Sequence, residues 1–331
     1  MVKISDVAAE ARVSVATVSR ALNGNPRVSA ELRRRVAEAA ERLGYRPNGI
    51  ARSLRRQSTD VIALIISDVS NPFFTAITRG VEDVARQNGL SVLLCNADED
   101  PVKEATYLGV VEQQKVAGVI LSPHSAATDV GRLHDTGIPL VAIDRHLSAD
   151  VDTVMVRSRD GARDATNHLI DAGWHRPACI TGPEDAETAQ ERLAGYLEAV
   201  RAHGNLAEIF VHASFRQEGG VRGAAQLLDA RNAPDALFVA NSQQALGVIE
   251  EVRRRGRRIG VDLGIITFDD APWAPFVDPP MSVIAQPAYD IGAQAATLLV
   301  ERIRTGMQGM TRHSMLSTTL IVRESSRLSS P

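Results

Sequence analysis

The feature that most constrains the fold is a regular alternation of apolar runs with amphipathic stretches, which begins at residue 61. Short continuous apolar runs predict buried strands, and stretches with apolar residues three and four positions apart predict helices. Strands that alternate with helices form parallel sheets covered on both faces. The clearest strand-like runs are residues 61–67, 90–96, 118–123, 139–144, 177–182, 209–213, 236–241, 263–268 and 281–286.

With a final run at 314–325, we expect about ten strands, which suit two doubly wound lobes better than a single sheet. Amphipathic helices are expected at 74–89 and 189–204. Ligands of doubly wound sheets bind outside the carboxyl ends of the strands. The pattern in residues 61–331 therefore predicts an α/β body, in which two doubly wound parallel-sheet lobes have a ligand cleft between them.

Residues 1–46 predict a separate all-α unit of three short helices. The first helix covers 5–11, the second begins after the N-cap Ser14, and the third begins after the N-cap Ser29. A tight turn joins the first two helices. This arrangement is typical of a helix-turn-helix unit.

The second helix carries the residues that could read DNA. Val15, Ala16 and Arg20 share its outward face, near the end that a recognition helix inserts into a major groove. An arginine pairs bidentately with guanine, and small apolar side chains suit the thymine methyl group. The polar residues expected to contact DNA beside them are Ser14, Thr17, Ser19 and Asn23. An ordinary three-helix bundle with a surface arginine is the alternative.

The distribution of charge is uneven. The chain has a formal net charge of −3, but residues 1–60 alone carry +6 and the remainder carries −9. Clustered lysine and arginine release counterions from a phosphate backbone, so the basic segment fits a polyanion-binding head. A solvated helical surface would give the same imbalance, and charge by itself leaves both interpretations open.

Several classes of protein are disfavoured. No apolar run has the length of a membrane span, and the N-terminus lacks the apolar core of a secretory signal. Cys95 and Cys179 lie in apolar runs and are too few for a disulfide framework or a structural zinc site. No phosphate-binding glycine loop, nucleophile elbow or zinc-hydrolase motif occurs. We therefore expect no enzyme activity, cofactor or metal, and a cytoplasmic, nucleoid-associated location.

The first of two specific resemblances lies in residues 3–48, KISDVAAEARVSVATVSRALNGNPRVSAELRRRVAEAAERLGYRPN. This stretch resembles, nearly position by position, the DNA-binding head of the LacI/GalR family of bacterial transcriptional regulators. The resemblance implies sequence-specific DNA binding. One departure is Arg12, in a turn where the family often has glycine or asparagine. An arginine there would strain the turn or add a phosphate contact.

Residues 47–60 connect the head to the body, and the helix they could form is too short to be stable alone. The resemblance implies a hinge helix that folds on the operator and inserts a leucine between base pairs in the minor groove. Leu54 is the matching residue. Arg52 and Arg55 are expected to contact phosphates, and Leu54 could instead pack on the body.

The body resembles the family's periplasmic-binding-protein-like effector domain. The landmarks are SDVSNPFF, NADED, GPEDAETAQERLAGY, FVAN, ITFDD and VIAQP. The resemblance implies lobes that exchange segments by crossovers. We assign about 61–158 and 288–313 to the N-terminal lobe, and about 159–287 and 314–331 to the C-terminal lobe.

The resemblance also implies an effector site. Phe73 and Phe74 stand where family members pack rings or apolar surface on the ligand, and Arg192 stands where an arginine grips ligand oxygens. Asp269 stands where a carboxylate accepts hydrogen bonds from the ligand, although the Asp269-Asp270 pair alone could also suit acid–base chemistry. Two further cleft positions, which could instead cap loops, are Asp144 and Asn241.

Two departures from the family affect the expected cleft. Val156-Arg157-Ser158 replaces a frequent Val-Asp-Asn, and Asn241-Ser242 replaces Asn-Asp. Both remove an acid, and Arg157 adds a cation near other arginines: Arg145, Arg159 and Arg192. This predicts an effector with a carboxylate or phosphate, such as a sugar acid or sugar phosphate. Arg157 could instead point to solvent or pair with a neighbouring carboxylate.

Together these features predict a homodimeric repressor that binds a pseudo-palindromic operator and is controlled by a small, sugar-like effector. The alternatives are a solute-binding protein, a regulator that needs no effector, and an enzyme on the doubly wound fold. The fused head and the missing signal argue against the first. The missing catalytic motifs argue against an enzyme, although the fold alone permits one.

Overall fold

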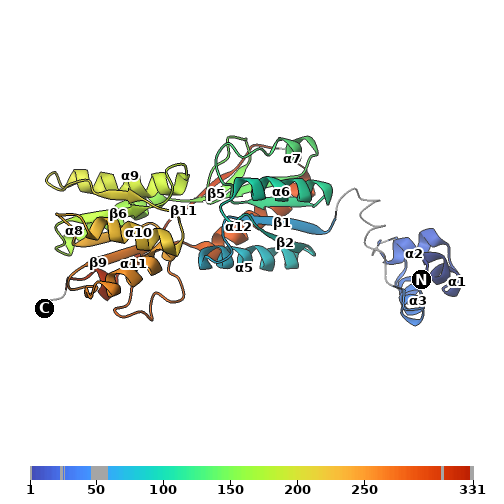
Figure 1. The fold of residues 1–331 in the computed structure, drawn as a ribbon. Helices are drawn as coiled ribbons and strands as arrows, with labels where there is room; N and C mark the ends of the chain where they lie inside the picture. Colours follow the sequence, from blue (N-terminus) through green and yellow to red (C-terminus); the bar gives the residue numbers. More distant parts are fainter. Residues whose placement is uncertain (1, 23–24, 26, 46–58, 307–308, 329–331) are drawn as a thin grey trace. The chain divides into compact units, whose positions relative to one another are not determined.

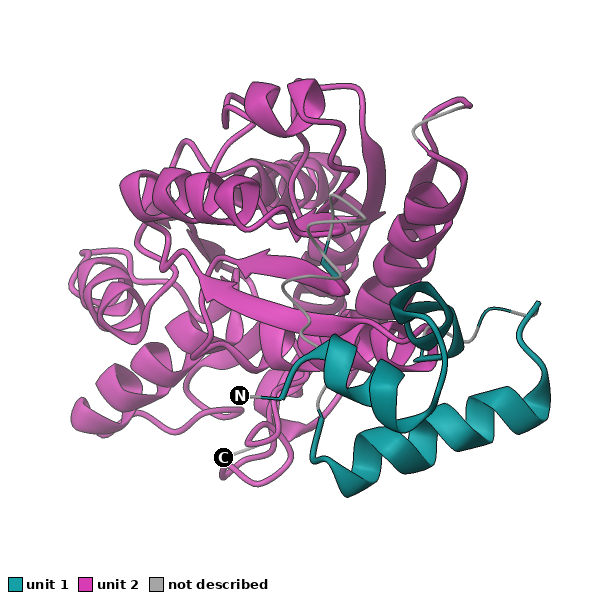
Figure 2. Ribbon diagram, turned by 90° about the vertical axis from the view of Figure 1, so that its right-hand side faces the viewer, with its two compact units in different colours: residues 1–59 teal, residues 60–331 magenta. Residues whose placement is uncertain are grey.

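The computed structural model describes residues 2–22, 25, 27–45, 59–306 and 309–328. The chain divides into two compact units, residues 1–59 and residues 60–331 (Figure 2). The first unit is the helical head and the second is the α/β body.

The head contains three helices, α1 (Ile4–Glu10), α2 (Val15–Leu22) and α3 (Ala30–Arg42). The Ser14 hydroxyl accepts a hydrogen bond from the Thr17 backbone N–H at 3.1 Å, and Ser29 caps α3 in the same way. Both predicted N-caps are therefore confirmed. Buried side chains from all three helices form one small core: Val7, Ala8, Val18, Ala21, Val36 and Ala39.

The described part of the body contains twelve strands in two six-stranded sheets. The first sheet comprises β1 (Val61–Ile66), β2 (Ser91–Asn96), β3 (Gly118–Leu121), β4 (Leu140–Ile143), β5 (Asp152–Val156) and β11 (His313–Leu316). The second comprises β6 (Pro177–Thr181), β7 (Phe210–His212), β8 (Ala236–Val239), β9 (Gly264–Phe268), β10 (Ser282–Ala285) and β12 (Thr319–Ile321). Every pairing is parallel except that of β10 with β12.

The two sheets have the same topology. Their strand orders are β11-β5-β4-β3-β1-β2 and β12-β10-β9-β8-β6-β7, so β1 corresponds to β6 and β4 corresponds to β9. Each sheet is the centre of one lobe, and Figure 1 shows the two lobes of the body side by side. The ends of β4 and β9, which correspond in this way, both contribute an aspartate to the cavity described below.

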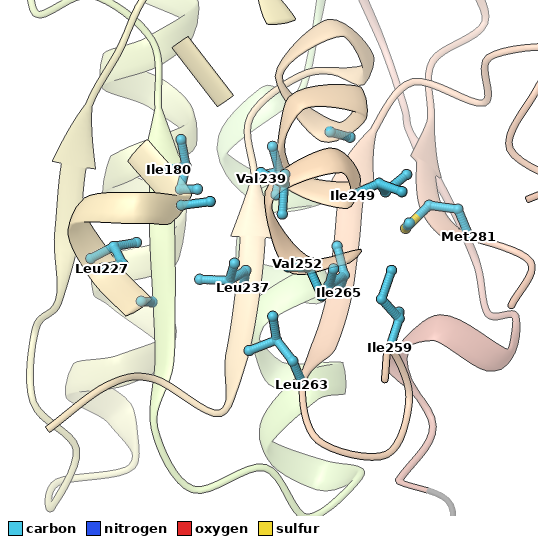
Figure 3. Packing of buried hydrophobic residues seen from close by; sticks show 14 of the residues in the cluster. Ile180, Leu227, Leu237, Val239, Ile249, Val252, Ile259, Leu263, Ile265 and Met281 are labelled. Atoms are coloured by element: carbon cyan, nitrogen blue, oxygen red, sulfur yellow. The ribbon is translucent and has the colours of Figure 1, made fainter. Parts of the chain in front are cut away.

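Helices cover both faces of each sheet, as the predicted parallel sheets require. The first lobe has α5 (Pro72–Gln87), α6 (Pro101–Gln113), α7 (Gly131–Asp135) and α12 (Ala288–Thr305). The second has α8 (Ser158–Asp171), α9 (Glu187–Ala202), α10 (Gln217–Leu228), α11 (Ser242–Arg254) and the short 3-10 helix η1 (Glu324–Ser326). Figure 3 shows one of the resulting cores, where Leu227 of α10 and Val252 of α11 pack on strand residues such as Leu237.

The body differs from the predicted strand pattern in two places. The predicted strand 314–325 is wrong, because Leu316 pairs with Val156 in the first sheet whereas Ile321 pairs with Val283 in the second. The last crossover therefore falls at 317–318, and the assignment of 314–316 to the C-terminal lobe is wrong. The nine other predicted strands are confirmed.

Strand β5 was missed because it begins with the polar pair Asp152-Thr153. Asp152 is buried, and the Arg302 guanidinium donates to it at 2.8 and 2.7 Å. Burial alone would raise the pKa of Asp152, but these hydrogen bonds and charges hold it below its ordinary value. A carboxylate paired in this way can occupy a buried strand. No helix in the part of the chain described here could cross a membrane.

Candidate functional sites

The exposed face of α2 has the composition predicted for DNA contact. Val15, Ala16 and Arg20 are exposed, with 45% of Val15 accessible, whereas Val18 and Ala21 are buried in the head. Ser14 is exposed and its hydroxyl forms a 2.8 Å hydrogen bond with that of Thr17, while Thr17 and Ser19 are partly buried. The remaining predicted DNA contacts lie outside the described residues: Asn23, Arg52, Leu54 and Arg55.

The turn between α1 and α2 contains an unusual backbone conformation. Arg12 has φ of +50°, in the left-handed region that favours glycine or asparagine. The Val13 N–H donates to the Ala8 carbonyl at 2.9 Å across this turn. The expected backbone strain at Arg12 is therefore confirmed, whereas its expected phosphate contact stays a prediction.

A cavity in the body has lining residues from both lobes. Its walls come from segments that follow strands and from the first turns of helices, as a doubly wound fold requires. The complete lining is Asp68, Asn71, Phe73, Phe74, Glu99, Asp144, Arg145, Thr188, Arg192, Phe215, Arg216, Asn241, Asp269 and Gln286. All but one of the predicted ligand residues are among them, the exception being Arg157.

Two buried aspartates occupy equivalent positions in the two lobes. Asp144 directly follows β4 and Asp269 directly follows β9, and their φ angles are +66° and +73°. Burial raises the pKa of both carboxyl groups, against the opposing effects of Arg145 and Arg192. Gln286 Nε2 donates to Asp269 Oδ1 at 2.6 Å. The cavity therefore presents one carboxyl group from each lobe.

Each lobe also contributes a buried arginine. The Arg145 guanidinium donates to both carboxylate oxygens of Glu99, at 3.0 and 2.7 Å. Burial lowers the pKa of Arg192, whose Nη1 donates to the Ala240 carbonyl at 2.7 Å and whose guanidinium lies 4.1 Å from the Phe268 ring centroid. Within the described residues, Nε of both arginines is buried without a hydrogen-bond partner, as is Oε1 of Gln286.

Aromatic rings complete the cavity. Phe73 and Phe74 begin α5, where the Asn71 side chain caps the helix by accepting from the Phe73 N–H at 3.0 Å. Their rings meet edge to face, with centroids 5.1 Å apart. Phe215 enters from the second lobe, and its ring lies 5.9 Å from the Arg145 guanidinium.

Asn241 lines the cavity and also caps α11. Its Oδ1 accepts from the Gln244 N–H at 2.8 Å and its Nδ2 donates to the Phe215 carbonyl at 3.0 Å. The capping role considered for this residue is therefore confirmed. Asn241 can cap the helix and also line the cavity, because the first turn of α11 lies beside the cavity.

The premise of a strongly positive cleft is wrong. Arg157 does not line the cavity; its side chain is 54% exposed and its Nη1 lies 3.9 Å from Asp160. Arg159 also lies outside the lining, where it pairs with Glu191. Four acids and three arginines line the cavity: Asp68, Glu99, Asp144, Asp269, Arg145, Arg192 and Arg216. This balance gives no excess of positive charge for an acidic ligand.

Sequence reasoning missed several lining residues, notably Glu99, Phe215 and Arg216. Glu99 follows β2, so its place after a strand was the available signal. Phe215 and Arg216 precede α10, in a stretch that contains no landmark noted in the sequence. Their proximity to the first lobe depends on how the lobes meet, which local patterns do not encode.

Comparison with known proteins gives the same two-part division. Residues 3–48 match the family described as bacterial regulatory proteins, lacI family, and residues 166–326 match the periplasmic binding protein-like domain. The ribose operon repressor of Halalkalibacterium halodurans is 37% identical over 99% of this chain and 98% of its own length. The transcriptional repressor CytR of Escherichia coli K12 is 33% identical over 98% of this chain and 96% of its own.

Solved structures agree over the whole chain. The transcriptional regulator CelR in complex with cellobiose is 32% identical, covers 98% of this chain and 100% of its own, and has a TM-score of 0.75. The lac repressor dimer bound to operator and the anti-inducer ONPF is 25% identical, covers 99% of both chains and has a TM-score of 0.88. These full-length similarities show a DNA-binding transcriptional repressor with a ligand-binding body rather than an enzyme, and the chain belongs to the LacI family of bacterial regulatory proteins.

Proposed function

We propose that this repressor binds a neutral sugar of monosaccharide size in the cavity and that the sugar controls its affinity for operator DNA. The observation that carries the proposal is the matched pair of largely buried groups, Asp144 with Arg145 in one lobe and Asp269 with Arg192 in the other. A sugar hydroxyl both donates and accepts, so neighbouring hydroxyls can satisfy a carboxylate and an arginine Nε that makes no hydrogen bond within the described residues. A neutral polyol needs no excess of cationic groups.

The rest of the cavity suits the same ligand. Phe73 and Phe74 offer apolar surface to the less polar face of a sugar ring. A regulator from Enterococcus faecium with bound ribose is 26% identical over 80% of this chain, with a TM-score of 0.72. With the similarity to a ribose operon repressor, this makes D-ribose the first candidate.

The head supplies operator binding in this proposal. Arg20 pairs with a guanine, and Val15 and Ala16 face thymine methyl groups. Backbone phosphates are contacted by Ser14, Thr17, Ser19, Asn23, Arg52 and Arg55. A homodimer presents two heads to a pseudo-palindromic operator, with hinge residues 47–60 placing Leu54 in the minor groove. Such binding locates the protein at the nucleoid in the cytoplasm.

Operator binding measured by fluorescence anisotropy tests the proposal. The DNA is the region upstream of the protein's own gene, the salt concentration is fixed, and the added compounds are D-ribose, cellobiose, D-gluconate and D-ribose 5-phosphate. D-Ribose is expected to change the operator Kd about tenfold or more. The acidic compounds are expected to have much weaker effects.

Asp269→Asn is the matched variant, because it keeps the size of the side chain but removes the charge that accepts from the sugar. We expect it to bind operator normally and to lose the response to D-ribose. A response to the acidic compounds alone would contradict the neutral ligand. An operator affinity that no added compound changes would favour a regulator without an effector.

A further inference from the structure

Three pairs of residues make polar contacts that join the two lobes. Arg216 Nη2 donates to the Asp98 carboxylate at 2.8 Å and to its carbonyl at 3.1 Å. Gln243 Nε2 donates to the Ser70 carbonyl at 2.9 Å. The Glu187 carboxylate accepts from the His146 backbone N–H at 2.6 Å and lies 2.5 Å from the His146 ring Nδ1. The six residues come from segments far apart in the sequence.

The contacts share one geometry. In each, the first lobe provides a residue from the segment that follows a strand: Ser70 after β1, Asp98 after β2 and His146 after β4. In each, the second lobe provides a residue at or beside the first turn of a helix: Gln243 in α11, Arg216 before α10 and Glu187 in α9. Because three separate strand ends are involved, the contacts restrain relative rotation of the lobes better than a single link.

Gln243 and the charged side chains are only partly buried, with 48% of Arg216 and 42% of Asp98 exposed. An exposed ion pair or hydrogen bond of this kind changes an equilibrium by about two- to five-fold. Several such contacts acting on one motion are enough to move a closing equilibrium measurably.

We propose that these residues form a clasp that favours the closed arrangement of the two lobes. The clasp residues are Ser70, Asp98, His146, Glu187, Arg216 and Gln243. They are positioning residues, because they bring Asp144 and Asp269 to the same cavity. The effect on sugar binding rests on the proposed function, whereas the effect of the clasp on the lobes of the ligand-free protein does not.

The clasp makes closing sensitive to salt. Salt screens the exposed Arg216–Asp98 ion pair, whereas the hydrogen bond from Gln243 to the Ser70 carbonyl joins neutral groups. Raising the ionic strength therefore increases the open population of the unmodified protein. Arg216→Gln removes most of that salt dependence, and Gln243→Ala opens the lobes but keeps it.

The distance between the lobes tests the proposal in the full-length protein without added sugar. Spin labels are attached at Val102→Cys in the first lobe and Asp185→Cys in the second. Pulsed electron paramagnetic resonance then measures the distance between the two labels. Both sites are exposed, and the native cysteines Cys95 and Cys179 are buried. Distance distributions are recorded at low and high salt in the labelled parent and in Arg216→Gln, Gln243→Ala and Glu187→Ala variants.

Arg201→Gln is the control variant, because Arg201 makes an exposed ion pair with Glu208 within the second lobe alone. Each clasp variant is expected to raise the ratio of open to closed molecules about two- to five-fold, and the control variant is expected to match the parent. Identical distributions in the parent and all clasp variants would overturn the proposal. So would an increase as large in the control variant.

The two proposals fail separately. If the clasp variants open the lobes but D-ribose does not change operator binding, the clasp stands and the proposed ligand is wrong. If D-ribose changes operator binding but no clasp variant changes the distance between the lobes, the ligand stands and the clasp is wrong.

Discussion

Replacing Arg12 by glycine tests whether the turn between α1 and α2 stores backbone strain. The φ of +50° costs a residue with a β-carbon about 1–2 kcal/mol. Glycine avoids this cost but loses about 0.5–1 kcal/mol through the greater freedom of the unfolded chain. The balance predicts that Arg12→Gly stabilises the head by about 0.5–1 kcal/mol.

Hydrogen exchange in the full-length protein measures this gain. The Val13 amide, which donates to the Ala8 carbonyl across the turn, is expected to exchange about two- to five-fold more slowly in Arg12→Gly. Arg12→Ala is the control, because it removes the charge but keeps the β-carbon. Equal protection in both variants, or faster exchange in Arg12→Gly, would refute the argument from strain.

The same variants separate strain from DNA contact. If Arg12 also binds a phosphate, both Arg12→Gly and Arg12→Ala reduce the slope of log affinity against log salt by about one. If the arginine has only the backbone effect, the slope stays at its original value in both. A glycine at this position would then improve the stability of the head without a loss of operator affinity.

Three further predictions concern the body. Gly292→Ala places a methyl group 2.1 Å from the Ile77 carbonyl oxygen, between α12 and α5, and should lower the free energy of unfolding by about 3 kcal/mol in thermal unfolding. Gly109→Ala is the control, because a methyl group there meets open space and should not lower that free energy. Burial lowers the pKa of His168, so the unfolded state binds the proton more readily; stability measured by urea unfolding should fall as pH drops below about 6.5, less so in His168→Gln. Because burial raises the pKa of Asp269, Asp269→Asn should raise the melting temperature of the ligand-free protein while abolishing the response to sugar.

The sequence predicted the fold well wherever a local pattern of residues is compatible with only one kind of element. The run VIALII of β1 is apolar throughout because both faces of its sheet are covered. Strand β5 broke this rule, since Asp152 is neutralised by an arginine about 150 residues away in the sequence. No local pattern could supply that partner.

The candidate site shows the same limit. Asp144 and Asp269 were identifiable because they directly follow strands, and the fold determines where strand ends lie. Arg157 also follows a strand, β5, but its side chain turns toward Asp160 and away from the cavity. Arg145 does line the cavity, but Glu99 balances its charge, because the guanidinium donates to both oxygens of that carboxylate. The charge of the cleft therefore depends on which acids pair with the arginines. A count of arginines in the sequence could not show this.

The equivalence of Asp144 and Asp269 explains how a small ligand can control the arrangement of a large body. The two carboxyl groups follow the corresponding strands β4 and β9, and burial disfavours the charged form of each. A ligand that donates to only one of them would gain nothing from closing the lobes. A ligand that donates to both is bound more tightly in the closed arrangement, and that difference in affinity is the free energy available to shift the lobes. The proposed function therefore predicts that control of operator binding requires the two aspartates together, and that replacing either one removes the response.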